Sequence, residues 1–173
     1  MPFAAVSIDA DESYPGELQA GEIPAFISRT KAQAYAEQLR PDQLLITADT
    51  IVWSDGHMLG KPHSEQEAFD MIRSLSGKTH QVYTAVTFAR KAPNYQLETI
   101  VDCTDVTFAE LTDEEIRHYI TCYRPMDKAG AYGVQEWIGY IACTAIHGSY
   151  FNVMGFPTHL VYAHLKKYIQ LNG

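Results

Sequence analysis

The sequence is short of basic residues. In its 173 residues, 13 Lys and Arg stand against 21 Asp and Glu, which gives a formal net charge of −8 at pH 7. Because nucleic-acid backbones are held mainly by excess Lys and Arg, this balance argues against a nucleic-acid-binding protein. A small nucleotide remains compatible with it, since a few local cations and a bound metal suffice for its phosphates.

Long apolar runs and a secretory leader are also lacking. No run approaches the roughly 20 apolar residues of a membrane helix, and residues 1–12 reach acidic residues without a basic leader region. Only three cysteines occur, Cys103, Cys122 and Cys143, and they are widely spaced. We expect free, buried thiols in a cytoplasmic protein without a membrane partner, a disulfide framework or a zinc site.

The stretch from Leu44 to Pro62 contains a carboxylate in an apolar setting. Leu44–Ile46 and Ile51–Trp53 read as buried strand segments, and Asp49 lies between them. A buried carboxylate is costly unless it is paired or metal-bound. The chain then turns back and delivers Lys61, which suits either a polyphosphate site with its metal or a hairpin with a structural hydrogen bond at Asp49.

The N-terminal quarter offers two further charged candidates. Asp9–Glu12 is an acidic run, read first as a solvated face and alternatively as a source of metal ligands. Val6 and Ile8 predict a short strand before it. A helix from Pro24 to about Leu39 places Lys31 among apolar neighbours, where a snorkelling side chain is the simplest interpretation.

The remaining chain alternates helices and strands. Capping boxes predict two of the helices, and alternating apolar residues predict a strand and its antiparallel return. These elements are a helix opened by Ser64 and Glu67 and closed by Gly77, a strand through Val82 to Phe88, a turn at Ala92–Asn94, a return strand from Leu97 to Leu111, a helix from Thr112 to Tyr123, and a final amphipathic helix from Thr158 through Ile169.

Residues 124–157 contain five glycines but match neither the Walker loop nor the dinucleotide-binding fingerprint. Asp127 and Lys128 precede Gly130, and Gln135 follows Gly133. Tight turns and a ligand-facing loop are both compatible with this spacing. The apolar stripe of the helix before it, which includes Tyr119, is assigned to the core.

Several motifs, in this order, resemble those of the Maf family over essentially the whole chain. They are Ala48-Asp49-Thr50, Leu59-Gly60-Lys61-Pro62, Leu75–Val82, Asp127–Gln135, Gly148-Ser149-Tyr150, Asn152-Val153 and Gly155-Phe156-Pro157. The resemblance implies an α/β fold, with a twisted mixed sheet flanked by helices and a central cleft between two lobes. It also implies one Maf-like domain over residues 1–173.

The resemblance further implies a septum-formation-type hydrolase of nucleotide metabolism. Maf proteins are nucleoside triphosphate pyrophosphatases that release pyrophosphate and a nucleoside monophosphate. Thr50 and Gln135 resemble the branch acting on dTTP and UTP, so pyrimidine nucleoside triphosphates are the implied partners. A magnesium or manganese ion and a homodimer are implied as well.

Roles for individual residues follow from the same resemblance. Asp49 matches the catalytic acid, acting as a general base or metal ligand, and Glu12 matches an acidic position near the metal. Lys31 and Lys61 match lysines that offset phosphate charge. For Asp127 and Lys128, a structural ion pair holding the loop is an equal alternative.

One family motif is missing. The S-x-S-P-R-R segment, which cradles phosphates, occurs nowhere in the sequence. We therefore expect a chain that lacks the family's first strand and helix. The alternative hypothesis is a truncated nucleotide-binding protein, weakly active or inactive, with a role in division and septum control.

Overall fold

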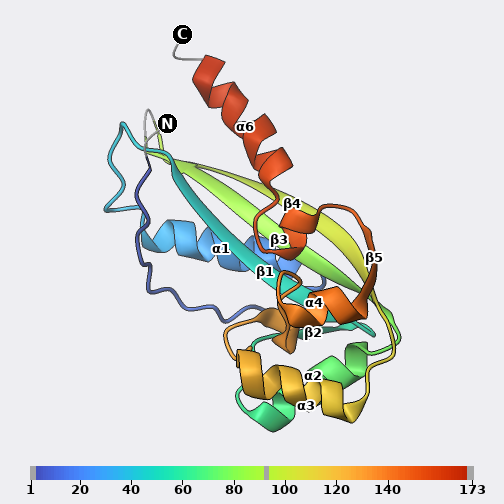
Figure 1. Ribbon diagram of the computed structural model, residues 1–173. Coiled ribbons are helices and arrows are strands. Elements are labelled where there is room, and N and C mark those ends of the chain that lie inside the picture. The colour runs from blue at the N-terminus through green and yellow to red at the C-terminus, as the bar shows by residue number, and fades with distance from the viewer. Residues whose placement is uncertain (1–2, 92–93, 171–173) are drawn as a thin grey trace.

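The computed structural model describes residues 3–91 and 94–170, with the side chains of 169 and 170 excepted (Figure 1). The elements in chain order are α1 (Glu22–Ala34), β1 (Leu45–Ser54), β2 (His57–Leu59), α2 (Glu65–Leu75), β3 (Thr79–Arg90), β4 (Gln96–Phe108), α3 (Asp113–Tyr123), η1 (Ala129–Ala131), α4 (Trp137–Ala142), β5 (Cys143–His147), α5 (Tyr150–Val153) and α6 (Thr158–Gln170).

The strands form one five-stranded sheet in the order β2-β1-β3-β4-β5. Every pairing among the described strands is antiparallel. The α/β architecture with a helix-flanked sheet is thus confirmed. Strand β2 pairs only with Val52–Ser54, whereas β3 pairs with all of Leu45–Trp53. Within the described residues, the first part of β1 therefore forms an edge of the sheet.

Strand β1 alternates cleanly between the two faces of the sheet, as a pleated strand must. Ile51 packs with Ile23 and Ile27 of α1, and the hydroxyl of Thr47 on the same face donates to the Ser28 carbonyl of α1 at 2.7 Å. The intervening residues Ile46 and Ala48 pack beneath α6, and Val52 enters the main core, all on the opposite face. Asp49 is consequently on the α1 face and Thr50 on the other.

The main core lies at the end of the sheet where α2 and α3 pack together below the strands (Figure 1). Its largest fully buried members come from β4, α2 and α3, and the Gly-rich segment adds Ala131, Tyr132 and Val134. Since the Gly-rich segment is built into this core, the loop that carries Asp127 to Gln135 has a rigid support.

The two N-terminal predictions need correction. Helix α1 ends at Ala34 instead of continuing to Leu39. The backbone closes into turns there, ahead of Pro41, which restricts the residue before it to extended conformations. Leu39 still reaches the core at 2% exposure. No strand forms around Val6 in the described residues, because this segment acquires no ladder partner.

Other predictions are refined. The cysteines are free, as expected, but Cys103 and Cys122 are exposed and Cys143 is half-buried, so the expected burial is wrong. The antiparallel return is confirmed as β4. The predicted turn at residues 92–94 falls largely on residues outside the described part. No helix in residues 3–91 and 94–170 has the length and apolarity needed to cross a membrane.

Candidate functional site

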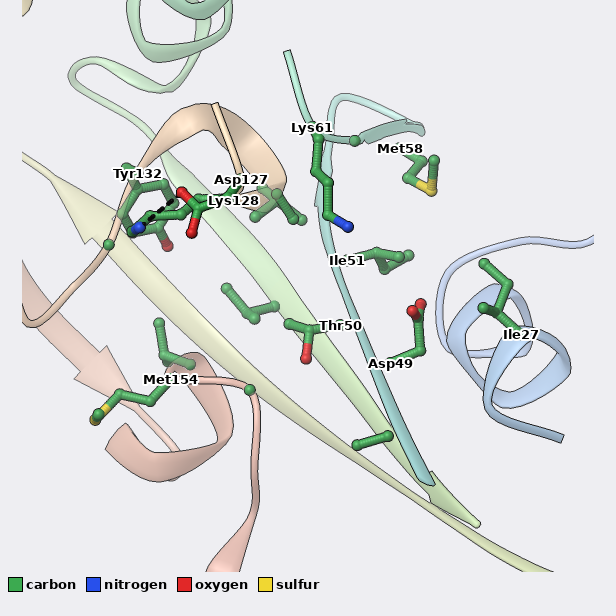
Figure 2. Close-up of a pocket in the computed structure, with 18 of the residues that line it drawn as sticks. Ile27, Asp49, Thr50, Ile51, Met58, Lys61, Asp127, Lys128, Tyr132 and Met154 are labelled. Atoms are coloured by element: carbon green, nitrogen blue, oxygen red, sulfur yellow. Dashed lines mark hydrogen bonds and ion pairs between the residues drawn. The ribbon is translucent and has the colours of Figure 1, made fainter. Parts of the chain in front are cut away.

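A cleft of about 640 Å³ opens along the edge of β1 (Figure 2). This volume lies within the range of small-molecule sites. The cleft is lined by residues that are distant in sequence, from the N-terminal segment, α1, β1, the β2 hairpin return, β3, the Gly-rich loop and the end of α5. Of the residues predicted for the site, Glu12, Asp49, Thr50, Lys61 and Gln135 all line it.

Asp49 is held by Lys31, which joins it to Glu12. The Lys31 ammonium lies 2.7 Å from Asp49 Oδ1 and 2.9 Å from Glu12 Oε1. Only 12% of the Asp49 side chain and 20% of the Lys31 side chain are exposed, against 49% for Glu12. Lys31 is therefore not a snorkelling side chain but an ion-pair partner, and Glu12 is drawn from its acidic run into the site.

Burial and pairing act in opposite directions on these groups. Burial raises the pKa of Asp49, even though the hydrogen bond and charge of Lys31 oppose the rise. Burial lowers the pKa of Lys31, but its hydrogen bonds to Asp49 and Glu12 and their negative charges outweigh that effect, so the pKa of Lys31 is raised overall. The hydrogen bond from Lys31 lowers the pKa of Glu12. Asp49 is thus a more basic carboxylate than an exposed aspartate, as a proton acceptor should be.

The donor set fits a hard divalent ion. Glu12 and Asp49 both line the cleft, and each directs one carboxylate oxygen to the Lys31 ammonium, so the two acids lie close together. Mg²⁺ is characteristically bound by one or two carboxylates together with waters and substrate phosphates. No cluster of three or more His, Cys, Asp or Glu side chains able to hold a metal occurs in the described residues. The protein would thus supply part of a coordination shell.

Lys61 is positioned by a tight hairpin and by the Gly-rich loop. Asp55 and Gly56, between β1 and β2, have φ values of 50° and 82°, as a two-residue hairpin turn requires. The carbonyl of Gly60 accepts a hydrogen bond from Gly130 N–H at 3.0 Å. Figure 2 shows the Lys61 side chain pointing into the cleft toward Asp49. Lys61, which follows the end of β2, therefore lines the same cleft as Asp49.

Thr50 faces the opposite part of the cleft from Asp49 (Figure 2). Its hydroxyl lies 2.9 Å from the hydroxyl of Thr84, which donates its proton to the Asn152 carbonyl. Since the one Thr84 proton is used there, Thr50 must donate to Thr84. Thr50 therefore presents lone pairs to the cleft, and it can accept a hydrogen bond from a ligand.

Asn152 fixes the segment that closes this end of the cleft. Its amide nitrogen donates to the Val82 carbonyl and to the Thr104 hydroxyl, both at 3.0 Å. The side chain is fully buried. Met154 and Gly155, which follow it, line the cleft next to Thr50. Gln135, in the Gly-rich loop, is exposed and lines the same cleft as Thr50.

Comparisons with known proteins agree with this arrangement. The model of the family described as Maf-like protein matches residues 1–168. The chain belongs to this family. It is 54% identical over 159 residues to a dTTP/UTP pyrophosphatase of Bacteroides thetaiotaomicron, covering 92% of this chain and 81% of the relative. A dTTP/UTP pyrophosphatase of Flavobacterium johnsoniae is 48% identical over 157 residues, covering 91% and 79%, and one of Porphyromonas gingivalis is 47% identical over 166 residues, covering 95% and 82%.

Within this Maf-like chain, the structure adds residues that sequence patterns did not identify. Tyr14, His63 and Met154 line the cleft. Glu136 lies 3.3 Å from the Lys128 ammonium, whose other partner is Asp127 at 2.9 Å. The Asp127–Gln135 motif ends before Glu136, and the contact of Glu136 with Lys128 forms only when the loop folds. The predicted Asp127–Lys128 ion pair exists, and both residues also line the cleft.

Proposed function

We propose that this protein hydrolyses dTTP and UTP between the α- and β-phosphates, giving the nucleoside monophosphate and pyrophosphate. The buried carboxylate of Asp49, facing lysines in a cleft of about 640 Å³, is the observation that carries the proposal. The names of relatives up to 54% identical support the same substrates. We further propose that it acts in the cytoplasm, and the implied homodimer stays a prediction.

In this proposal, Asp49 accepts the proton of a water that attacks phosphorus. Burial raises the pKa of Asp49 and makes it a better proton acceptor than a solvated aspartate, while the hydrogen bond and charge of Lys31 oppose that rise. General-base catalysis of this kind commonly contributes about 10²- to 10⁴-fold to a rate. Asp49 takes up one proton, the new P–O bond forms, and the leaving pyrophosphate oxygen departs with the bond electrons.

The cations of the cleft would offset phosphate charge. Lys61 reaches in from the hairpin return, and Lys31 supports the acids from the α1 side. Glu12 and Asp49 would hold Mg²⁺ or Mn²⁺ together with phosphate oxygens and waters. When bound, this ion supplies positive charge to the developing transition state.

The compartment between Thr50 and Gln135 would read the base. Thr50 offers an acceptor because its proton is used by Thr84. Thymine and uracil carry an N3–H donor, whereas cytosine has an unprotonated N3. The Gln135 amide can donate to one carbonyl and accept elsewhere on the base. This pattern favours the two bases named in the relatives over cytosine.

A pyrophosphate-release assay tests the function. Purified protein is supplied with Mg²⁺ or Mn²⁺ and with dTTP, UTP, CTP, GTP or 7-methyl-GTP, and release is expected from the first two. Asp49→Asn should lower kcat at least 100-fold while the protein remains folded. Asp55→Asn removes a carboxylate from the exposed hairpin turn, and it serves as the matched control with activity near wild type. Turnover by Asp49→Asn within tenfold of wild type would disprove the role of Asp49.

A further inference from the structure

The Gly-rich loop contributes a second lysine, besides Lys61, to the lining of the cleft. The Lys128 side chain is 21% exposed and lines the cleft. Its ammonium lies 2.9 Å from Asp127 Oδ1 and 3.3 Å from Glu136 Oε1. The two carboxylates differ in burial, because Asp127 is 76% exposed and Glu136 only 21%. One partner is therefore free to leave into solvent, and the other is fixed.

Glu136 is fixed by a residue of the core. The hydroxyl of Tyr119 donates to Glu136 Oε2 and accepts from Gly133 N–H at 3.0 Å. Tyr119 belongs to α3 and is fully buried. Burial and the adjacent carboxylate raise the pKa of Tyr119, so its hydroxyl remains a donor at every physiological pH. The Lys128 ammonium is thus linked to the packed core through Glu136 and Tyr119.

The loop backbone at Gly133 packs closely against the side chains of Lys128 and Glu136. A Cβ at Gly133 would lie 3.0 Å from Lys128 Cε and 3.0 Å from Glu136 Cδ. These contacts are tighter than side chains normally tolerate, so the absence of a side chain at Gly133 permits the pair to form beside the backbone. The ammonium is consequently oriented before any ligand arrives, which reduces the entropy lost on binding.

We propose that Lys128 binds a phosphate group of the nucleotide, and that Glu136 and Tyr119 position it. This inference rests on the proposed function. An arriving phosphate oxygen replaces Asp127 as a partner of the ammonium, and the exposed Asp127 carboxylate turns to solvent. Glu136 stays in place, because it is held by Tyr119. A charge-assisted hydrogen bond of this kind commonly accounts for about a 10- to 100-fold difference in affinity.

Binding of inorganic pyrophosphate with Mg²⁺, measured by calorimetry, tests this inference without requiring turnover. Lys128→Met should weaken pyrophosphate binding about 10- to 100-fold, and Lys128→Arg should restore most of it. Lys78→Met removes the same charge from an exposed ion pair with Asp55, outside the cleft, and should bind like wild type. Pyrophosphate binding by Lys128→Met within threefold of wild type would overturn the proposal.

The positioning role has a separate signature. Glu136→Gln and Tyr119→Phe should each weaken pyrophosphate binding by a smaller factor and raise the KM for dTTP more than they lower kcat. The double variant Lys128→Met/Glu136→Gln should bind pyrophosphate no more weakly than Lys128→Met alone, because Glu136 acts through Lys128. If the two effects multiply instead, Glu136 supports the loop generally and the positioning role is wrong.

Failure of the proposed function is distinguishable from failure of this inference. If Lys128→Met weakens pyrophosphate binding but the wild-type protein hydrolyses no nucleoside triphosphate, the phosphate site stands and the proposed function is wrong. If the wild-type protein hydrolyses dTTP but Lys128→Met binds pyrophosphate normally, the proposed function stands and the phosphate site is wrong.

Discussion

Substitution of Gly130 by Ala tests how the Gly-rich loop is attached to the site. Gly130 has a φ of 65°, and a Cβ there would lie 2.8 Å from Cγ2 of Val52, with the other Val52 side-chain carbons at 3.1 and 3.2 Å. Val52 is 2% exposed and packs in the main core, so it has little room to move. The backbone N–H of Gly130 also holds Gly60, next to Lys61. The substitution should therefore affect both stability and the cleft.

The expected size follows from two costs. Placing a side chain in the left-handed region costs about 1–2 kcal/mol, and overpacking a core contact costs about 1–3 kcal/mol more. Gly130→Ala should thus lower the free energy of unfolding by roughly 2–5 kcal/mol. For a chain of this length, roughly 3 kcal/mol corresponds to a Tm lowered by about 6–12 °C.

Gly56→Ala separates the two costs, since Gly56 has a φ of 82° but no neighbour within 4 Å of its virtual Cβ. Urea unfolding of both variants should show Gly130→Ala to be the less stable by about 1–3 kcal/mol. Val52→Ala removes Cγ2, the closest carbon, together with Cγ1, so in the double variant the losses should fall short of their sum. Equal losses for the two glycine variants would refute the clash.

Two further predictions concern charged and titrating groups. Without nucleotide, the Lys31→Met variant should bind Mn²⁺ more tightly than wild type or the Lys78→Met control, because the Lys31 ammonium lies between the two proposed ligands, Glu12 and Asp49. Calorimetry measures this binding, and equal or weaker binding by Lys31→Met would contradict the prediction. Burial lowers the pKa of His80 to about 4, so the stability that neutral His80 provides is present above pH 6.5 and lost as the pH falls toward 4, roughly 3 kcal/mol in all. His80→Gln should flatten this part of the profile of stability against pH, and parallel profiles for wild type and His80→Gln would show that His80 does not titrate this way.

Local sequence signals predicted the parts of the fold that short-range chemistry determines. The capping box of Thr112 and Glu115 forms in full at the start of α3. At α2, Ser64 accepts from Glu67 N–H as expected, but the Glu67 carboxylate reaches past it to His63 N–H at 2.7 Å. This second capping box is therefore incomplete. The Glu67 carboxylate instead holds the backbone of His63, and His63 lines the cleft.

Residues that act through long-range contacts could be found only in part. The motif identified Asp49 and Lys61, whose approach is set by a short hairpin. The Lys31 contact with Asp49 depends instead on how α1 crosses the sheet, and a helical pattern alone favoured a snorkelling side chain. Tyr119 has the periodicity of a core residue and is one. Periodicity says nothing about the hydroxyl, so its bond to Glu136 could not be anticipated.

The pleat of β1 explains how two neighbouring residues would serve opposite ends of the proposed ligand. Successive side chains of a strand point to opposite faces, so Asp49 meets Lys31 on the α1 side, and Thr50 meets Thr84 on the other. In the middle of a sheet, neighbouring strands would separate these two sites. Because β2 ends before it reaches them, the cleft passes around the edge of β1 and contacts both. A one-residue slip of β1 would exchange the two faces. The register of β1 on β3, and no single side chain, therefore keeps Asp49 and Thr50 in one cleft, where the proposed proton transfer and nucleobase recognition would take place.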